Sequence, residues 1–425
     1  MKNLFLPLIV CAMLSSELPA QPKPAQQGPD QPCHATETDK AYATAAAQLK
    51  YALKLAEQAR QQESNVAKRC VVPTTVADDG SLVLIDPSDW RSGFFAGTLW
   101  QMYAYTHDDF WRQQAFTYTW LIEDAKKCRD THDLGFMINN SFGKAYELTG
   151  ERSSRDVMLQ ATRTLADRFS ERTQCIRSWD HTQERWHYPV IIDNMMNLEM
   201  LFRATELTGD STFWRIAVRH ANTTIRNHFR PDYSSYHVVD YNPETGAVRM
   251  KCTHQGYSDE SFWSRGQGWG LYGFTMCYRF THDPAYLAQA EAIADFILGW
   301  ENLPADGIPY WDMRAPEVLG RTALDVASDV PRDASAGALI ASAMYELSTY
   351  TDSARSLRCR ALADRIVHSL NTSVYRAETG TNGGFLLLHS TGNLPAGSEI
   401  DVPLSYADYY YLEALARKEQ LDNNK

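Results

Sequence analysis

Apolar residues recur at helical spacing along most of the chain. Between Ala41 and Gln62, for example, Leu49, Leu53 and Ala56 fall on one helical face. A short sequence motif, at which one helix ends and the next begins, recurs roughly every 40 to 75 residues. Its Gly or His suits a helix C-cap and its Asp suits the following N-cap. The copies are Tyr105–Asp108, Glu147–Gly150, Glu206–Asp210, Phe280–Asp283 and a looser Glu346–Thr349.

This repeat predicts an all-α fold. About six helix pairs fit between Ala41 and Leu421. Six helical hairpins closed into a ring make an (α/α)6 toroid, whose cavity is lined by residues near the ends of the inner helices. An open solenoid of helical repeats, used as a binding scaffold, is the alternative. The copies differ strongly from one another, which favours the closed toroid.

One stretch departs from the helical pattern. His237–Tyr241 and Ala247–Lys251 alternate with a period of two and flank the turn signal Asn242–Gly246. We therefore expect a small β-hairpin inserted between helices. Insertions on repeat scaffolds usually gather on the functional face.

Composition and charge narrow the range of possible functions. The 425 residues are 44% hydrophobic and 22% charged, as in globular proteins, with a net charge of -11. The acidic balance argues against nucleic-acid binding. The aromatic content of 12% suits a protein that stacks sugars or other flat ligands. The 8 Cys are scattered without a CxxC or Cys/His cluster, so no metal site is predicted, while one or two disulfides stay open.

The N-terminus has the pattern of an export signal. A basic start precedes the apolar run Leu4–Leu14, which is too short to span a bilayer, and no other run approaches that length. We expect a signal peptide over 1–20, a Pro/Gln-rich linker over 21–37 and a single catalytic domain over 38–421. The predicted location is the periplasm of a bacterium. A lipid anchor at Cys11 is the alternative.

Two aspartates are candidates for acid–base chemistry. Asp193 lies in the apolar run Val190–Leu198, where burial would raise its pKa unless it is paired, and Asn197 shares its helical face. Asp133 lies at a predicted helix start, where backbone amides favour the ionised form. The two would then hold opposite protonation states, as an acid–base pair does. The alternatives are a plain N-cap for Asp133 and a buried structural acid for Asp193.

Arg265 and Trp269 are four residues apart and share a helical face. A guanidinium beside an indole is a good seat for a ring that carries a carboxylate. The glycines between them would permit close approach or serve only helix packing. Trp90 and Phe94 are also four residues apart, a spacing that is equally typical of aromatic residues in an ordinary hydrophobic core.

At these residues the sequence resembles glycoside hydrolase family 88, the unsaturated glucuronyl hydrolases. The resemblance runs in order from about residue 85 to 418, and no single phrase is specific without the others. The matching phrases are His132–Phe136, Ile192–Leu198, Thr253–Gly256, Ser264–Trp269 and Tyr406–Leu415.

The resemblance implies an (α/α)6 barrel that needs neither metal nor cofactor. Its substrate would be an oligosaccharide with a 4,5-unsaturated uronic acid at the non-reducing end, as a polysaccharide lyase leaves it. The family hydrates the vinyl ether: a proton goes to C4, water adds to C5, and the hemiketal collapses. By match, Asp193 is the general acid/base, and Asp133 holds ring hydroxyls and stabilises the developing positive charge.

The resemblance also implies substrate contacts. The loop Leu394–Pro403 keeps Ser398 but carries acids where relatives that prefer sulfated substrates have Lys, so it leaves the sulfation preference open. The implied polar contacts are His132, His237, Gln255 and Arg265, and the implied aromatic walls are Trp90, Phe94, Trp179 and Trp269.

Two other functions stay open at this point. One is an unsaturated rhamnogalacturonyl hydrolase, which applies the same hydration to pectin fragments. The other is a non-catalytic carbohydrate-binding toroid, against which the presence of both Asp133 and Asp193 weighs. An unsaturated uronyl oligosaccharide is the expected partner, with no nucleic acid and no membrane span, and no oligomeric state is favoured.

Overall fold

The computed structural model describes residues 36–315 and 330–423. Glu37–Lys425 form one compact unit. The predicted signal peptide, Cys11 and nearly all of the predicted linker lie outside the described residues, so the predicted domain limits stay predictions. Within the described ranges, no helix combines the length and the apolar character needed to cross a bilayer.

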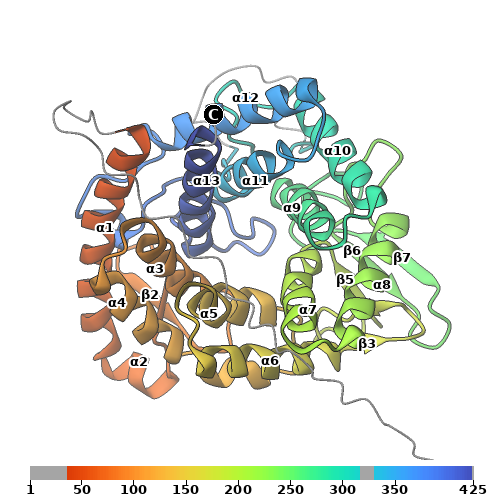
Figure 1. The fold of residues 1–425 in the computed structure, drawn as a ribbon, viewed down its shortest axis with the longest axis horizontal. Coiled ribbons are helices and arrows are strands. Elements are labelled where there is room, and N and C mark those ends of the chain that lie inside the picture. The colour runs from red at the N-terminus through yellow and green to blue at the C-terminus, as the bar shows by residue number, and fades with distance from the viewer. Residues whose placement is uncertain (1–35, 316–329, 424–425) are drawn as a thin grey trace, which may run out of the picture. The chain divides into compact units, whose positions relative to one another are not determined.

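Two rings of helices build this unit, and the chain alternates between them (Figure 1). The ring closes where α13 packs against both α3 and α11. The prediction of an (α/α)6 toroid is thus confirmed. The outer helices are α1 (Glu37–Arg60), α4 (Asp109–Trp120), α6 (Arg152–Ala166), α8 (Ser211–Asn227), α10 (Pro284–Gly299) and α12 (Ser353–Leu370). The inner elements are α3 (Ser92–Thr106), the π-helical η2 (Gly135–Gly143) continued by α5 (Lys144–Thr149), α7 (Asn194–Thr208), α9 (Ser264–Thr281), α11 (Ala334–Leu347) and α13 (Ser405–Asn423).

Burial patterns separate the two rings. The outer helix α8 buries Phe213, Ile216, Ala217 and His220 on one stripe and exposes the opposite face. The inner helix α9 is buried at every position from Ser264 to Cys277 because it is covered on all sides. Glycines in α9 permit this close packing: a Cβ at Gly273 would lie 2.4 Å from the Met195 Cβ of α7.

The recurring phrases end the inner helices as predicted. His107, Gly150, Gly209 and His282 all take the left-handed conformation at helix C-caps, with φ between 52° and 74°. The acids that follow in three copies cap the next outer helix, each accepting from a backbone N–H two residues on: Asp108, Asp210 and Asp283.

The predicted hairpin is present and belongs to a larger sheet. β6 (Val238–Tyr241) and β7 (Val248–Cys252) pair antiparallel, and β5 (Pro189–Ile191) joins the free edge of β6. Sequence patterns did not reveal β5. The other short elements are β1 (Val72–Val76) with β2 (Leu82–Ile85), β3 (Phe169–Ser170) with β4 (Cys175–Ile176), helix α2 (Glu63–Lys68), and the 3-10 turns η1 (Glu123–Lys127) and η3 (Asn382–Gly384).

The cysteines of the described residues are all free thiols. Four of them are buried, so they act as small apolar side chains in the packing. The disulfides left open by the sequence are therefore not formed among Cys70, Cys128, Cys175, Cys252, Cys277 and Cys359.

Candidate active site

A cavity of about 610 Å³ opens where the inner helices begin, and we call it the front cavity. Five of the six inner elements supply it with a residue at the first turn or up to two residues before it. The five are Arg91 before α3, Asp133 before η2, Asp193 before α7, Arg265 in α9 and Tyr406 in α13. The sixth element, α11, is connected to the cavity only through Asp333, which pairs with Arg265.

Helix N-termini contribute partial positive charge to the front cavity. They carry unsatisfied backbone N–H groups and a partial charge equivalent to roughly half an elementary charge each. Five inner elements begin at this cavity. These helix ends favour an anionic group such as a carboxylate, and they act against a lining in which five acids (Asp89, Asp130, Asp133, Asp193 and Glu399) outnumber Arg91 and Arg265.

Asp193 lies between β5 and α7, directly before the first turn of α7. It occupies the N-cap position, yet its side chain caps no backbone N–H, and its Oδ1 has no hydrogen-bond partner among the described residues. Burial, and then the nearby charge of Asp133, raise the pKa of Asp193 well above its ordinary value. A carboxyl group with these surroundings is a proton donor near neutral pH.

Asn197 does not orient Asp193 in the way the shared helical face suggested. Its Oδ1 accepts from the backbone N–H of Phe136 at 3.1 Å, and its backbone lies against Gly135. Asn197 therefore fixes the start of η2 relative to α7. That contact holds the segment that carries Asp133 beside the segment that carries Asp193.

Two neighbours hold the carboxylate of Asp133. Thr131 Oγ1 donates to its Oδ2, and His132 Nε2 lies 3.2 Å from its Oδ1. His132 is itself buried and is anchored by its backbone N–H, which donates to Ser178 O. Burial lowers the pKa of His132, so its imidazole is neutral and contacts Asp133 without the charge of an ion pair.

Arg265 lines the front cavity, but its guanidinium is already engaged. Nη1 pairs with Asp333 and donates to Thr391 O at 2.7 Å, while Nη2 donates to Gly392 O at 2.6 Å. The guanidinium also lies over the rings of Trp263 and Tyr406. Arg265 thus ties α9 to α11 and to the 391–392 loop, while its Nε and one N–H of Nη2 have no partner among the described residues. Its contact with the substrate stays a prediction.

His237 lies behind the cavity wall. Its Nδ1 accepts from the backbone N–H groups of His254 and Gln255, both at 3.1 Å, so the ring proton is on Nε2. Gln255 does reach the cavity, and its Nε2 donates to Gly392 O at 3.1 Å. His237 is buried beneath the loop that presents Gln255 and shapes that loop, while its Nε2 has no partner among the described residues. Its direct contact with the substrate stays a prediction.

Three of the four predicted aromatic residues line the cavity wall, and the fourth packs behind it. Trp90, Trp179 and Trp269 line the front cavity. Phe94 does not, because the first turn of α3 directs it into the packed rings of Phe136 and its neighbours, where it is completely buried. The expectation of Phe94 as a wall residue is thus corrected to a residue that supports Trp90 at a ring distance of 6.0 Å.

The front cavity also has lining residues that the sequence analysis did not propose as site candidates, among them Tyr406, Glu399 and Arg91. The hydroxyl of Tyr406 has no partner among the described residues. Glu399 pairs with Arg91, which also binds Asp89, and burial raises the pKa of Glu399. Tyr406 and Glu399 fall within segments that the family resemblance already marks, whereas no local pattern singles out Arg91.

A toroid of this kind, with two neighbouring carboxyl groups and indole walls at the N-terminal ends of its inner helices, has the features of a carbohydrate-active hydrolase. The sequence profile of Glycosyl Hydrolase Family 88 matches residues 66–297. An unsaturated glucuronyl hydrolase of Formosa agariphila is 46% identical over 79% of this chain and 82% of its own length. An unsaturated chondroitin disaccharide hydrolase of Streptococcus pneumoniae is 32% identical over 81% of this chain and 85% of its own length.

Solved structures agree with these relatives. The crystal structure of an unsaturated glucuronyl hydrolase specific for heparin superposes with a TM-score of 0.83 at 40% identity, covering 91% of this chain and 98% of the other. The chain therefore belongs to Glycosyl Hydrolase Family 88, and it is a glycoside hydrolase.

Proposed function

We propose that this enzyme removes a 4,5-unsaturated uronic acid from the non-reducing end of lyase-generated oligosaccharides, with glycosaminoglycan disaccharides as its principal substrates. One observation carries the proposal: Asp193 is a buried acid of raised pKa whose carboxyl Oδ1 has no hydrogen-bond partner among the described residues, and it lies with Asp133 in a cavity at the helix N-termini. The names of the relatives, which act on unsaturated glucuronyl and chondroitin substrates, support this substrate class.

Asp193 and Asp133 have different roles in the hydration reaction. Protonated Asp193 delivers its proton to C4 of the enol ether, and positive charge develops at C5 and the ring oxygen. The carboxylate of Asp133, held by Thr131 and His132, stabilises that charge. Ionised Asp193 then takes a proton from the water that adds to C5. The resulting hemiketal opens to a ketone, and the C1 hemiacetal so exposed releases the second sugar with the glycosidic oxygen.

The uronate carboxylate is bound with help from the field of the helix ends and from Arg265, which lines the cavity. Asp333 and Thr391 O engage Nη1 of Arg265, and Gly392 O engages one N–H of Nη2, so Nε and the second N–H of Nη2 are left for the substrate. Tyr406 and Gln255 offer neutral hydrogen-bonding groups on the same wall. Trp179, stacked on His181 at 5.3 Å, forms an aromatic platform in the same cavity for the second sugar.

The test is loss of the absorbance of the C4=C5 double bond across a panel of lyase products. We expect glycosaminoglycan disaccharides to be cleaved and saturated glucuronides to be inert, since they have no double bond to protonate. Faster cleavage of a pectin-derived disaccharide would assign the enzyme to the rhamnogalacturonyl class. Saturable binding of every compound without turnover would instead identify a carbohydrate-binding toroid.

We also propose that the enzyme is exported to the periplasm after removal of residues 1–20. The basic start and the apolar run Leu4–Leu14 support this. Mass spectrometry of the mature protein from the periplasmic fraction would locate the new N-terminus. A diacylated mature protein that begins at Cys11 would establish the lipoprotein alternative, and a full-length cytosolic protein would refute export.

A further inference from the structure

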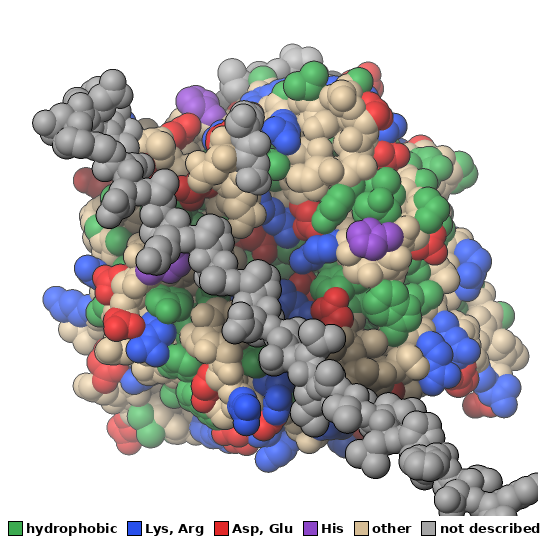
Figure 2. Space-filling model, viewed as in Figure 1, with side chains coloured by type: hydrophobic (Ala, Val, Ile, Leu, Met, Phe, Trp, Pro, Cys, Tyr) green, Lys and Arg blue, Asp and Glu red, His purple; other side chains and the backbone are tan. Residues whose placement is uncertain are grey.

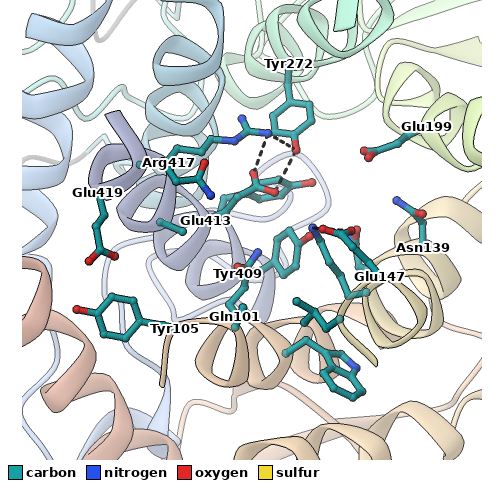
Figure 3. Close-up of a pocket in the computed structure, with 18 of the residues that line it drawn as sticks. Gln101, Tyr105, Asn139, Glu147, Glu199, Tyr272, Tyr409, Glu413, Arg417 and Glu419 are labelled. Atoms are coloured by element: carbon teal, nitrogen blue, oxygen red, sulfur yellow. Dashed lines mark hydrogen bonds and ion pairs between the residues drawn. The ribbon is translucent and has the colours of Figure 1, made fainter. Parts of the chain in front are cut away.

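A second cavity, of about 500 Å³, lies where the inner helices end, and we call it the rear cavity (Figure 3). α3, η2 with α5, α7, α9 and α13 all contribute to its lining. Figure 2 shows acidic and basic side chains interspersed near the centre of the face where these helices meet. Polar lining residues used below are Gln101, Asn139, Glu199, Tyr272, Tyr409 and Glu413.

The rear cavity is not the far end of the front one. Packed aromatic rings separate them: Phe136 lies 5.1 Å from Trp269, Trp269 lies 5.4 Å from Tyr410, and Phe94 fills the centre of this layer. Trp269 lines the front cavity, whereas Phe136 and Tyr410 line the rear one. A molecule in the rear cavity therefore cannot contact Asp193, and the substrate cannot thread through.

A chain of alternating charges surrounds the rear cavity. It connects five inner elements, because each acid bridges to a base on its own or the next helix. In order, its members are Lys144 and Glu147 of α5, Arg203 and Glu199 of α7, Arg279 of α9, Glu346 of α11, and Arg417 and Glu413 of α13. Figure 3 shows Glu199, Tyr272, Glu413 and Arg417 around the open space.

The chain has no net charge, with four acids balancing four bases. Burial opposes the ionisation of Glu199, but Arg279 and Arg203 overcome it and lower the pKa of Glu199 to about 2. Glu199 therefore stays ionised throughout the physiological pH range. Glu419 of α13 adds one further acid to the lining. Because each arginine of the chain is already paired with glutamate, a buried anion finds no unpaired cation here, whereas a neutral ligand with many hydroxyl groups finds donors and acceptors in alternation.

Uncharged groups complete this lining opposite the ion pairs. Asn139 Oδ1 and Asn140 Nδ2 have no hydrogen-bond partner among the described residues, although both side chains are more than nine-tenths buried. Gln101 of α3 lies on the cavity wall, where the charge chain has its gap. The phenol of Tyr409 points into the same space (Figure 3). Amides and a phenol beside aromatic rings are the groups that bind sugar hydroxyls and ring faces.

We propose that the rear cavity is a second carbohydrate site, which takes a neutral pyranose sugar. Its volume falls within the range of roughly 300 to 1,000 Å³ that is ordinary for small-molecule sites. A sugar hydroxyl donates one hydrogen bond and accepts others, so vicinal hydroxyls match an alternating row of carboxylates and guanidinium groups. The proposal does not depend on the substrate proposed for the front cavity.

The test is calorimetric titration of the full enzyme with glucose, galactose, N-acetylglucosamine and N-acetylgalactosamine, with glucuronate as the charged counterpart. We expect at least one neutral sugar to bind with a dissociation constant of about 1 mM, ordinary for a ligand of this size, and glucuronate not to compete with it. In Gln101→Ala/Tyr409→Phe the affinity should fall by about tenfold or more, because two hydrogen-bonding groups are lost.

Tyr345→Phe is the matched control, since that hydroxyl binds Asp364 outside both cavities. It should leave the sugar affinity unchanged. Absence of saturable binding by any neutral sugar would overturn the proposal, as would equal affinity in the double variant or competitive inhibition of disaccharide hydrolysis. Sugar binding in an enzyme that cleaves no unsaturated disaccharide would refute the proposed function alone.

Discussion

Replacing Asp193 with asparagine should abolish turnover while leaving the fold intact. The exchange keeps the size of the side chain but replaces the titratable carboxyl group with an amide, which can neither give up nor take up a proton near neutral pH. General acid–base catalysis contributes typically about 10² to 10⁴-fold, which corresponds to about 3 to 5 kcal/mol of barrier. Asp193 both protonates C4 and deprotonates water in the proposed mechanism, so we expect the loss of kcat to reach the upper end of that range.

The structure predicts that this loss carries no cost in stability. The Asp193 side chain caps no backbone N–H, and its Oδ1 accepts nothing, so asparagine breaks no hydrogen bond there. The folded pKa of Asp193 is raised above its ordinary value of 3.8, so the wild type loses stability as the pH rises through and beyond that value. Asp193→Asn escapes this loss, and its Tm should equal or exceed that of the wild type, increasingly so at higher pH.

The assay pairs the absorbance of an unsaturated disaccharide with thermal unfolding at several pH values. Asp408→Asn is the matched control, since burial raises the pKa of Asp408 to about 8 as well, but its carboxylate binds the backbone N–H groups of Leu386 and Leu387. That variant should change Tm and keep most of kcat. An Asp193→Asn enzyme that retained a tenth of the wild-type rate would refute the role of Asp193.

Four further results are expected. Asp133→Asn should lower kcat by several orders of magnitude in the absorbance assay, with KM changing less, because the developing charge loses its partner. Arg265→Ala should lower the free energy of unfolding by about 3 to 5 kcal/mol in urea titrations, because Asp333 is left buried and unpaired; an unchanged stability would contradict the ion pair. In heavy water the released uronic acid product should carry deuterium at C4 by mass spectrometry, and its absence would exclude vinyl-ether hydration. Glu199→Gln should remove part of the acid sensitivity of Tm: the stability from Glu199 is full above its ordinary pKa of 4.5 and is lost as the pH falls through about 2.

The fold was predictable where local chemistry repeats. The His-Asp and Gly-Asp phrases require a left-handed C-cap followed by an N-cap, and both form at His107–Asp108, Gly209–Asp210 and His282–Asp283. The period-two alternation of the hairpin was equally local. β5 was missed because three apolar residues, Pro189–Ile191, fit a buried strand and a buried helix equally well.

The site was predictable as a set of residues but not as a set of bonds. Spacing places Arg265 and Trp269 on one face of α9, and both do line the front cavity. The guanidinium is bound by the carboxylate of Asp333 and the carbonyl oxygen of Thr391, which are 68 and 126 residues farther along the chain. The same holds for His237, because the loop it supports closes over it only in the folded sheet. No local pattern reveals partners at such separations.

The direction of the inner helices explains why the chemistry lies at one mouth of the toroid. Five of the six inner elements begin at the front cavity, so their N-terminal fields add there and favour the uronate that the proposed substrate carries. The front lining has more acids than bases, and both Arg91 and Arg265 are ion-paired, so the helix ends have to supply the positive field for that carboxylate. The C-terminal ends of the helices leave partial negative charge at the rear cavity, where Arg203, Arg279 and Arg417 lie and are each paired with glutamate. An anionic sugar therefore finds favourable helix N-termini beside Asp193, whereas at the rear cavity it finds unfavourable helix C-termini and bases that are already paired.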